Sequence, residues 1–467
     1  MTRTTRGDFG PFGDKMREAG LPAAAIRSFG ADYEKLASGS SGTISESEID
    51  PVGALPHQDE LAEHAGAGRD FVRRTAVIKL NGGLGTSMGM RAAKSLLPVK
   101  GEFTFLDLIA RQVLHLREAY GGPVPLVLMD SFRTRDDSLE RLAAYPELAH
   151  GGLPLDFLQH KVPRIRADDL TPVEWPTEPD LEWCPPGHGD LYLALSSSGM
   201  LASLRKAGCD FAFVSNSDNL GAVLDPALLG WMACERIPFV MEVCRRTPTH
   251  RKGGHLARFQ SGELVLREIA QCPEGEEAAF QDIDRHSWFN TNNLWIDLRV
   301  LERVLEEREG VLGLPMIRNE KRVDANDSDS PRVIQLETAM GAAISVFPGA
   351  RAVHVAGDRF APVKSTADLL TVWSDAYELY EDWRIVPAAD AGLPVVDLDP
   401  GYYKGVDQLT ARFPAGAPSL VGCRGLRVEG DVTFGRDVTC RGDVELTAAH
   451  AASVPDGAVL EGSTRLD

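Results

Sequence analysis

Short apolar runs alternate with longer segments of helical periodicity from residue 75 onward. The apolar runs are bounded by glycine, proline or asparagine, as strands buried in a sheet usually are. The intervening segments place apolar residues three and four positions apart, which predicts amphipathic helices. This alternation predicts an α/β protein with a doubly wound mixed sheet. We expect strands at 75–80, 124–129, 155–158, 211–215 and 238–243, and helices at 104–119, 135–144, 190–207 and 225–234.

The pattern changes after residue 245. Leu256–Phe259 and Leu264–Ile269 flank Gly262, which predicts a β-hairpin inserted between strands of the sheet. The later elements that we expect are a strand at 293–296, helices at 299–307 and 337–347, a strand at 351–355 and a helix at 366–380.

Two apolar rows with a six-residue period run through the C-terminal part of the chain. Glycines stand between the rows, and this spacing predicts a parallel β-helix, with a short β-meander as the alternative. The first row is Leu420, Leu426, Val432, Val438 and Val444, and the second is Val428, Phe434, Cys440 and Leu446.

These patterns divide the chain into three parts. Residues 1–70 form a partly helical N-terminal extension, with helical segments expected on either side of Gly20-Leu21-Pro22. Residues 71–385 carry the α/β pattern, and residues 386–467 carry the six-residue rows. A short β-helix has open ends with unpaired strand edges, so the C-terminal part is a candidate surface for a homo-oligomer.

Composition and charge exclude several classes of protein. The chain of 467 residues has 49 basic and 68 acidic residues and a formal charge of −19, so a nucleic-acid partner is not expected. The seven cysteines are scattered without metal-binding spacing, which indicates reduced thiols in a cytoplasmic protein. No apolar run approaches the roughly 18 residues of a membrane helix, so no membrane association is expected.

A glycine-rich segment follows the first predicted strand. In KLNGGLGTSMG at 79–89 the glycines bring backbone N–H groups close to a ligand, at the place where α/β proteins bind nucleotide phosphates. Lys94 adds a mobile positive charge beyond the segment. Neither the Gly-Lys-Ser/Thr end of a Walker loop nor the G-x-G-x-x-G spacing of a dinucleotide loop is present. The segment therefore predicts a third kind of phosphate-binding loop, and a glycine-rich turn without a ligand is the alternative.

Two further motifs carry candidate chemistry. PPGHGD at 185–190 places His188 at the expected start of a helix, where anions bind. The apolar strand that begins at Phe211 ends in polar residues, among them Asp218. Mg²⁺ takes one or two carboxylates and completes its shell with phosphates and water, so Asp218 is a candidate ligand. A structural histidine and an ordinary Asx turn are the respective alternatives.

Four weaker candidates come from the second half of the chain. The polar clusters KGG at 252–254 and NTNN at 290–293 suit sugar hydroxyls, or equally a hairpin turn and a strand entry. Glu337 is expected to begin a helix, where its charge would be favourable without any ligand. Lys364 precedes another expected helix, and periodicity alone favours a solvated surface lysine.

Together the motifs resemble those of the eukaryotic-type UTP–glucose-1-phosphate uridylyltransferases, or UDP-glucose pyrophosphorylases. The resemblance extends from about residue 70 to residue 460 and keeps the order of the motifs. The matching segments are KLNGGLGTSMG (79–89), TFLDL (104–108), PLVLMDSF (125–132), PPGHGD (185–190), FVSNSDNLG (213–221), FVMEV (239–243), KGG (252–254), FNTNNLW (289–295), QLETAMGAA (335–343) and PVKSTADLL (362–370).

The resemblance implies a fold and an activity. The fold would be a glycosyltransferase-A-like nucleotidyltransferase domain followed by a C-terminal left-handed parallel β-helix. The reaction would make UDP-glucose and pyrophosphate from UTP and glucose 1-phosphate, with Mg²⁺ as cofactor. Because a phosphate nucleophile is already ionised at neutral pH, catalysis would consist of positioning and charge stabilisation, without a general base.

The resemblance also implies a role for each candidate residue. Lys94 and Lys364 would be the catalytic cations, and Asp218 would hold the metal. The nucleotide would be bound by Leu80, Asn81, Gly82, Gly83, Lys94, Gln159, Gly187 and Lys364. The sugar phosphate would be bound by His188, Asn216, Asp218, Gly254, Asn292 and Glu337.

The sequence departs from the family pattern at two places, and three other functions are alternatives to this interpretation. Arg91-Ala92-Ala93 stands where the family usually has Lys-Gly-Pro, and His255 stands where a small polar residue is common. A broad UDP-sugar pyrophosphorylase and a UDP-N-acetylglucosamine pyrophosphorylase are the enzymatic alternatives. A non-catalytic sugar-nucleotide sensor is the third, although binding alone would not require Lys94, Asp218 and Lys364 together.

Overall fold

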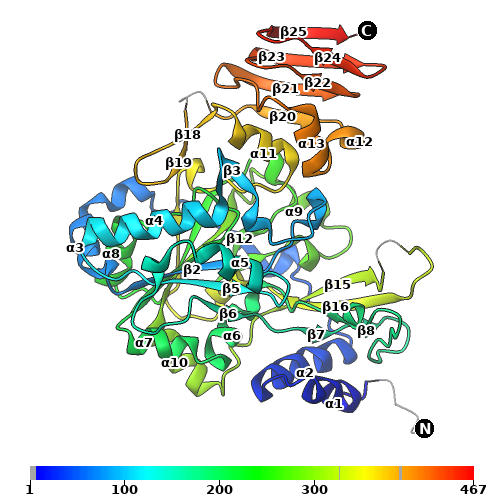
Figure 1. Ribbon diagram of the computed structural model, residues 1–467. Coiled ribbons are helices and arrows are strands. Elements are labelled where there is room, and N and C mark those ends of the chain that lie inside the picture. The colour runs from blue at the N-terminus through cyan, green and yellow to red at the C-terminus, as the bar shows by residue number, and fades with distance from the viewer. Residues whose placement is uncertain (1–6, 325–326, 389–391, 467) are drawn as a thin grey trace.

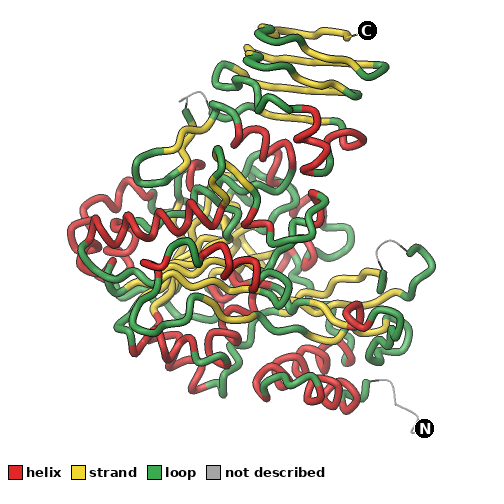
Figure 2. The backbone as a smooth tube through the Cα atoms, viewed as in Figure 1, coloured by secondary structure: helices red, strands yellow, loops and turns green. Residues whose placement is uncertain are grey.

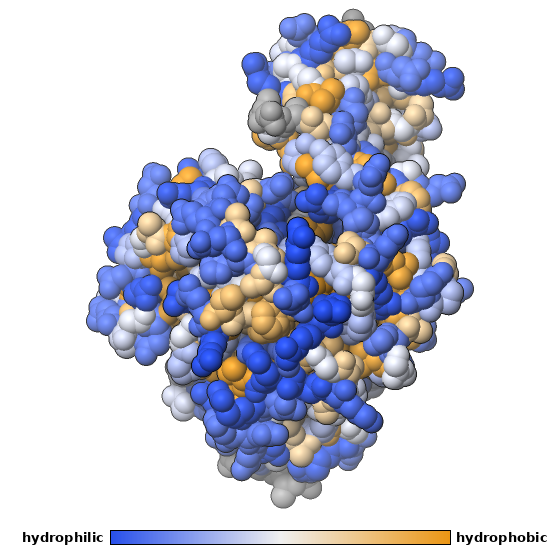
Figure 3. Space-filling view, turned by 90° about the vertical axis from the view of Figure 1, so that its left-hand side faces the viewer, coloured by the Kyte–Doolittle hydropathy of each residue, from blue (hydrophilic) through white to orange (hydrophobic). Residues whose placement is uncertain are grey.

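The computed structural model describes residues 7–324, 327–388 and 392–466. Its main body is a mixed β-sheet with helices on both faces, and a smaller lobe of stacked strands projects from the body at the C-terminal end (Figure 1). The space-filling view shows this lobe projecting from the body, with hydrophilic and apolar residues interspersed on its visible face (Figure 3).

Ten strands form the central sheet. In chain order they are β1 (Ile49–Pro51), β2 (Thr75–Asn81), β5 (Leu126–Asp130), β6 (Asp156–Leu158), β10 (Phe211–Asn216), β11 (Phe239–Arg245), β12 (His255–Phe259), β13 (Leu264–Arg267), β14 (Trp288–Asp297) and β17 (Arg351–His354). Neighbours follow the order β1-β12-β14-β10-β2-β5-β6, with β11 beside β14, β17 beside β11 and β13 beside β12.

The sheet is mixed, as the sequence predicts. Strands β10, β2, β5 and β6 are parallel neighbours, whereas β14 runs antiparallel to both β10 and β11. The carboxyl ends of the parallel strands therefore meet along one edge, which is where ligands bind in open α/β sheets.

Helices cover both faces because alternate residues of each central strand point to opposite sides. Val77 of β2 packs with the core on one face, under α3, α4 and α8, and Ile78 packs with the core on the other face, under α6, α7 and α10. The helices of the main body are α3 (Ala65–Val72), α4 (Phe105–Tyr120), α5 (Arg135–Leu142), α6 (Leu191–Ser197), α7 (Met200–Lys206), α8 (Pro226–Cys234), α9 (Glu277–Phe280), α10 (Leu298–Glu307) and α11 (Thr366–Trp373).

The N-terminal extension packs onto the body through two helices and a strand. Helices α1 (Gly10–Glu18) and α2 (Ala23–Ala37) lie on either side of Gly20-Leu21-Pro22, as predicted. They pack against a three-stranded sheet that projects from the body in Figure 1. Its strands are β15 (Met316–Arg322), β16 (Arg332–Thr338) and β8 (Ile165–Arg166). Strand β1 then joins the edge of the central sheet beside β12.

Short strands and a hairpin complete the body. They are β3 (Pro98–Lys100), β4 (Phe103–Thr104), β7 (Val162–Pro163), β9 (Trp183–Cys184), β18 (Tyr377–Leu379) and β19 (Ile385–Pro387). The C-terminal lobe contains α12 (Pro400–Tyr403), α13 (Val406–Arg412), β20 (Val395–Leu398), β21 (Cys423–Glu429), β22 (Val432–Phe434), β23 (Thr439–Ala448), β24 (Ala452–Val454) and β25 (Val459–Leu466).

Strands of the C-terminal lobe stack in layers (Figure 2), and their neighbouring pairs are parallel. One sheet has the order β20-β21-β23-β25, and β22 pairs with β24. Leu426 lies beside Val444 and Val428 beside Leu446, three six-residue periods apart. All members of both apolar rows are buried. The rows therefore face the interior, and the parallel pairing excludes the β-meander, whose neighbouring strands are antiparallel.

Four predicted elements were wrong in extent or type. The helix expected at 190–207 is two helices, broken where Gly199 adopts φ +77°. The helix expected at 337–347 is a strand that contains Glu337 in β16, followed by a 3₁₀ turn at Met340–Ser345, because pairing with β15 overrides local propensity. The helix expected at 366–380 stops at Trp373 and is followed by β18. The strand expected at 293–296 begins already at Trp288, in β14, whereas the hairpin expected around Gly262 is confirmed as β12–β13 and joins the central sheet through β14.

All seven cysteines lie in described parts of the chain and are free thiols, as expected. Across those same parts of the chain, no helix combines the length and the apolar character needed to span a bilayer.

Candidate active site

The glycine-rich loop leaves the carboxyl end of β2 in a compact conformation. Gly85 and Gly89 have φ of +63° and +76°, in the left-handed region that favours glycine. The amide of Lys94 donates to the carbonyl of Gly83 over 3.0 Å, which closes the loop on itself. Gly83 remains exposed, so its backbone faces solvent at the sheet edge.

Asn81 anchors the base of this loop with its side chain. Its Nδ2 donates to Oδ1 of Asp130 over 2.7 Å and to Oγ of Ser138 over 2.8 Å, and the residue is buried. Burial raises the pKa of Asp130 to about 6. The Asn81 side chain is thus committed to neighbouring strand and helix residues, which leaves its backbone for any ligand.

Gln159 faces the loop from the end of β6. Its backbone N–H donates to the carbonyl of Asp130 over 2.8 Å. A Cβ at Gly82 would lie 2.9 Å from the Gln159 side-chain amide, so glycine is the residue that this close approach permits. The structure therefore brings Gln159 against the loop, although 77 positions separate it from Gly82 in the sequence.

Gly187 and His188 form a second tight element beside β16. Gly187 has φ +79°, and a Cβ there would overlap the carbonyl oxygen of Thr338. The amide of Met340 donates to Nδ1 of His188 over 3.0 Å, so the imidazole proton is on Nε2. Burial lowers the pKa of His188 to about 4, which keeps the ring neutral at physiological pH. Glu337, in β16, lies next to Gly187.

Lys94 and Asp218 form an ion pair beyond the carboxyl ends of β2 and β10. Nζ of Lys94 donates to Oδ2 of Asp218 over 2.5 Å, and both side chains are half-buried. Asn216 pairs with Leu80 across the parallel strands β10 and β2, and the Ser217 amide donates to the Leu80 carbonyl over 3.0 Å. Among the described residues, Oδ1 of Asp218 has no hydrogen-bond donor.

Lys364 approaches the same strand end from a distant segment of the chain. The amide of Val363 donates to the carbonyl of Asp218 over 3.2 Å. Lys364 is exposed, and within the described chain its Nζ forms no hydrogen bond or ion pair, although it lies 5.6 Å from the ring centre of Phe360. Its own amide and that of Ser365 are held by the Asp368 carboxylate, which caps α11.

The sugar-side candidates gather around β13 and β14. A Cβ at Gly254 would lie 2.6 Å from Oε2 of Glu268, a residue that sequence reasoning missed. Burial raises the pKa of Glu268, whereas the charge of Lys364 acts in the opposite direction. Asn292 has a left-handed φ of +60°, and its amide and side chain both bond to Asn290. A non-glycine residue held in this region inside a strand often marks a functional position.

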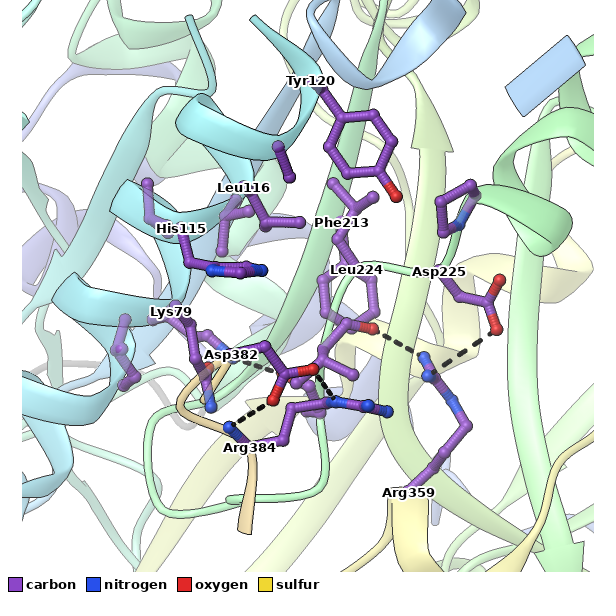
Figure 4. A pocket seen from close by; sticks show the side chains of 18 residues that line it. Lys79, His115, Leu116, Tyr120, Phe213, Leu224, Asp225, Arg359, Asp382 and Arg384 are labelled. Carbon is purple, nitrogen blue, oxygen red and sulfur yellow. Dashed lines mark hydrogen bonds and ion pairs between the residues drawn. The ribbon is translucent and has the colours of Figure 1, made fainter. Parts of the chain in front are cut away.

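A buried polar network around Glu242 was also missed. Glu242 of β11 pairs with Arg359, and Asn219, Asn293 and Trp295 join them. Asn293 belongs to the NTNN cluster that was expected to suit sugar hydroxyls, but its pairing with Glu242 could not be read from the sequence, because only the folded register brings these residues together. On the far side of the network, Arg359 reaches towards Asp225 at the edge of a cavity of about 340 Å³ between α4 and strands β2 and β10 (Figure 4).

Comparison with known proteins identifies the family. The sequence model of the family described as UTP–glucose-1-phosphate uridylyltransferase matches residues 26–441. The chain is 37% identical over 450 residues to the UTP–glucose-1-phosphate uridylyltransferase of Hordeum vulgare, covering 95% of this chain and 92% of that protein.

Solved structures agree. A Leishmania major UDP-glucose pyrophosphorylase variant in complex with UDP-glucose has a TM-score of 0.91 and 43% identity, with 99% of this chain and 100% of that chain covered. The UDP-glucose phosphorylase of Trypanosoma brucei has a TM-score of 0.90 and 42% identity at the same coverage. The chain therefore belongs to the UTP–glucose-1-phosphate uridylyltransferase family.

Proposed function

We propose that the protein makes UDP-glucose and pyrophosphate from UTP and glucose 1-phosphate. The observation that carries the proposal is the convergence of Lys94, Asp218 and the Lys364 segment at the carboxyl ends of β2 and β10. Two cations and a carboxylate at one sheet edge suit the transfer of a phosphorylated group between two anionic substrates.

In the proposed complex, one set of residues at this sheet edge binds the nucleotide. Leu80, Asn81, Gly82 and Gly83 contact it through their backbone, while Gln159 and Gly187 read the uracil. The contact between Gln159 and Gly82 supports this role, since an amide beside exposed backbone groups offers paired donors and acceptors to a pyrimidine edge.

A second, adjoining set of residues binds the sugar phosphate. His188 donates from Nε2 to the phosphate, which its neutral tautomer supports. Asn216, Gly254, Asn292 and Glu337 contact the sugar. We add Glu268 to this set, because its carboxylate lies against Gly254 and suits a sugar hydroxyl as hydrogen-bond acceptor.

Asp218 is the proposed ligand of Mg²⁺. A single carboxylate with one open oxygen fits this ion, which binds through one or two carboxylates and completes its shell with phosphate oxygens and water. When bound there, Mg²⁺ would neutralise charge on the phosphates. Lys94 is close enough to Asp218 to contact the same phosphates.

The chemistry needs no proton transfer. A phosphate oxygen of glucose 1-phosphate forms a bond to the α-phosphorus of UTP, the bond from that phosphorus to the bridging oxygen breaks, and pyrophosphate leaves. Lys94 and Lys364 stabilise the charge that shifts onto the reacting oxygens. The remaining residues hold both substrates in line.

We also propose the finer organisation of the chain. Residues 71–385 are the glycosyltransferase-A-like catalytic domain, residues 1–70 are an extension packed on it, and residues 386–467 are a left-handed parallel β-helix. Paired residues of neighbouring strands are three six-residue periods apart, which supports a β-helix in which each turn has three short faces of six residues. A cytoplasmic location and pairing of identical subunits through the open end at β25 complete the proposal.

The test is pyrophosphate release from UTP and Mg²⁺ with glucose, galactose and N-acetylglucosamine 1-phosphates. Release with glucose 1-phosphate alone would support the proposal with narrow specificity. Comparable release with several sugars would favour a broad UDP-sugar pyrophosphorylase, and release only with the N-acetylated sugar would favour the UDP-N-acetylglucosamine enzyme. Folded protein that binds UTP but releases nothing would contradict catalysis and favour a sensor.

A further inference from the structure

We propose that the buried Glu242–Arg359 ion pair positions Lys364 for catalysis by fixing its segment against the strand end that carries Asp218. The proposal rests on the reaction proposed above. Neither Glu242 nor Arg359 is among the expected substrate contacts, so both would be positioning residues that act through the Lys364 segment.

Glu242 provides a rigid anchor inside the sheet. It lies at a register shift of β11 between Met241 and Val243, and an irregularity of this kind re-aims a side chain out of the regular alternation. Both carboxylate oxygens are fully used. Oε1 accepts from Arg359 Nη2 over 2.6 Å and from Trp295 Nε1 over 2.8 Å, and Oε2 accepts from Arg359 Nε over 2.8 Å and from Asn293 Nδ2 over 3.0 Å.

Arg359 transmits this anchor to the chain around it. Its guanidinium also donates to the carbonyl of Val223 over 2.8 Å, on the loop that follows Asp218. Its own carbonyl accepts from Asn219 Nδ2 over 3.1 Å and from Asn293 Nδ2 over 3.2 Å. The planar guanidinium of Arg359 bonds Glu242 and the Val223 carbonyl at fixed angles. It therefore restrains the backbone of Arg359 more tightly than the single ammonium group of a lysine would.

The fixed segment leads directly to Lys364. Beyond Arg359, the amide of Ala361 donates to Oδ1 of Asn219 over 2.9 Å, and the amide of Val363 donates to the carbonyl of Asp218 over 3.2 Å. A Cβ at Gly221 would overlap the carbonyl oxygen of Asp358, so the two segments are in backbone contact. The backbone bonds and contacts of Arg359, Ala361 and Val363 therefore fix the chain that leads to Lys364 at the strand end that carries Asp218.

Stability alone does not account for such a pair. Burying two charges carries a large desolvation cost, and apolar residues of similar volume often replace a buried ion pair without loss of stability. What apolar residues cannot replace is the directional hold on the Val223 carbonyl and on the Arg359 backbone. These directional hydrogen bonds are therefore what a positioning role requires and a packing role does not.

The experiment compares Arg359→Lys with the double variant Glu242→Met/Arg359→Met. Wild-type protein is first shown to release pyrophosphate from UTP and glucose 1-phosphate. For Arg359→Lys we expect kcat to fall by about 10- to 100-fold, the scale of a misplacement near 1 Å, with the Kd for UTP changed less than about threefold. We expect the double variant to keep a melting temperature near that of wild type and still to have low kcat. Wild-type kcat in the double variant would overturn the proposal.

A coupling measurement tests whether the pair acts through Lys364. In a Lys364→Ala background, Arg359→Lys should lower kcat by less than about threefold, because the positioned group is gone. A full additional loss would refute the proposal. The matched control is Arg205→Lys, which alters the Arg205–Asp210 pair at the other end of β10 and should leave kcat unchanged.

Hydrogen exchange provides a readout that does not depend on the reaction. Arg359→Lys should raise the exchange rates of the Ala361 and Val363 amides by at least about tenfold, while amides of β2 stay protected. Unchanged rates at both amides would refute the positioning role even if the protein has another activity. If wild-type protein released no pyrophosphate and Arg359→Lys still exchanged faster at both amides, the positioning role would be supported and the proposed function refuted.

Discussion

Nζ of Lys94 lies 2.5 Å from Oδ2 of Asp218, although 124 positions separate the two residues in the sequence. The pair joins Lys94, five residues beyond the glycine-rich segment at 79–89, to Asp218, two residues after the end of β10. Each side chain is only partly exposed, so each depends on the other for charge compensation before substrates bind. The phosphates of a nucleotide would then replace the carboxylate as partner of the lysine.

Replacing Lys94 tests this arrangement. We expect Lys94→Ala to lower kcat for pyrophosphate release by ~10²-fold or more, as removal of one preorganised donor does elsewhere. The matched control is Lys15→Ala, because the Lys15–Glu182 pair has similar exposure but links α1 to the loop before β9. Near-wild-type turnover in folded Lys94→Ala protein would contradict the role.

Lys364 is the second cation and differs from Lys94 in that its Nζ has no hydrogen-bond or ion-pair partner among the described residues. Its removal should therefore cost turnover and not stability. We expect Lys364→Ala to lower kcat by ~10²-fold with a melting temperature within about 2 °C of wild type, measured by pyrophosphate release and thermal unfolding. Lys206→Ala, at an exposed position in the last turn of α7, is the control and should change neither quantity. Unaltered kcat in Lys364→Ala would refute the assignment.

Much of this site was predictable because its residues are tied to strand ends. An apolar run followed by glycines or by Asn216 and Asp218 marks the carboxyl edge of a parallel sheet, and the register then brings Leu80 beside Asn216. Lys364 was predictable only through the family motif, since its local pattern is that of a surface lysine. The burial of both C-terminal rows was likewise readable from a six-residue period.

The parts that sequence reasoning missed depend on contacts between distant segments. In the sequence, Glu242 is a lone charged residue in the apolar strand expected at 238–243. Its role is evident only from its ion pair with Arg359, which lies 117 positions later in the chain. Glu337 was expected in a helix, but pairing of β16 with β15 made it a strand residue. Local propensity carries no information about either event.

Replacing Gly82 tests the proposed nucleotide-binding residues. A Cβ at this position would lie 2.9 Å from the Gln159 amide and would have to displace it. We expect Gly82→Ala to raise the Kd for UTP by about tenfold or more, measured by titration calorimetry, with little change in the unfolding midpoint. Gly66→Ala in α3 is the control, because a Cβ there meets no atom within 4 Å. Equal UTP affinity in Gly82→Ala and wild type would show that UTP binding does not depend on the position of the Gln159 side chain beside Gly82.

His188 makes the stability of the fold depend on pH. Its pKa is lowered to about 4 from 6.5 by burial, and Nδ1 accepts from the Met340 amide, so the folded protein holds the neutral ring. Between pH 6.5 and 4 the unfolded chain binds the extra proton. The contribution of the neutral ring is therefore fully present above pH 6.5 and is lost as the pH falls towards 4.

The measurement is urea unfolding of wild type and His188→Gln at pH 7, 6, 5 and 4.5. The other histidines are common to both proteins, so the difference between the two unfolding free energies isolates His188. We expect that difference to shift against wild type by up to about 1.4 kcal/mol for each pH unit below 6.5. A difference that stays constant from pH 7 to 4.5 would mean that His188 titrates normally in the fold, and that the neutral Nε2 donor proposed for the sugar phosphate is not held by burial.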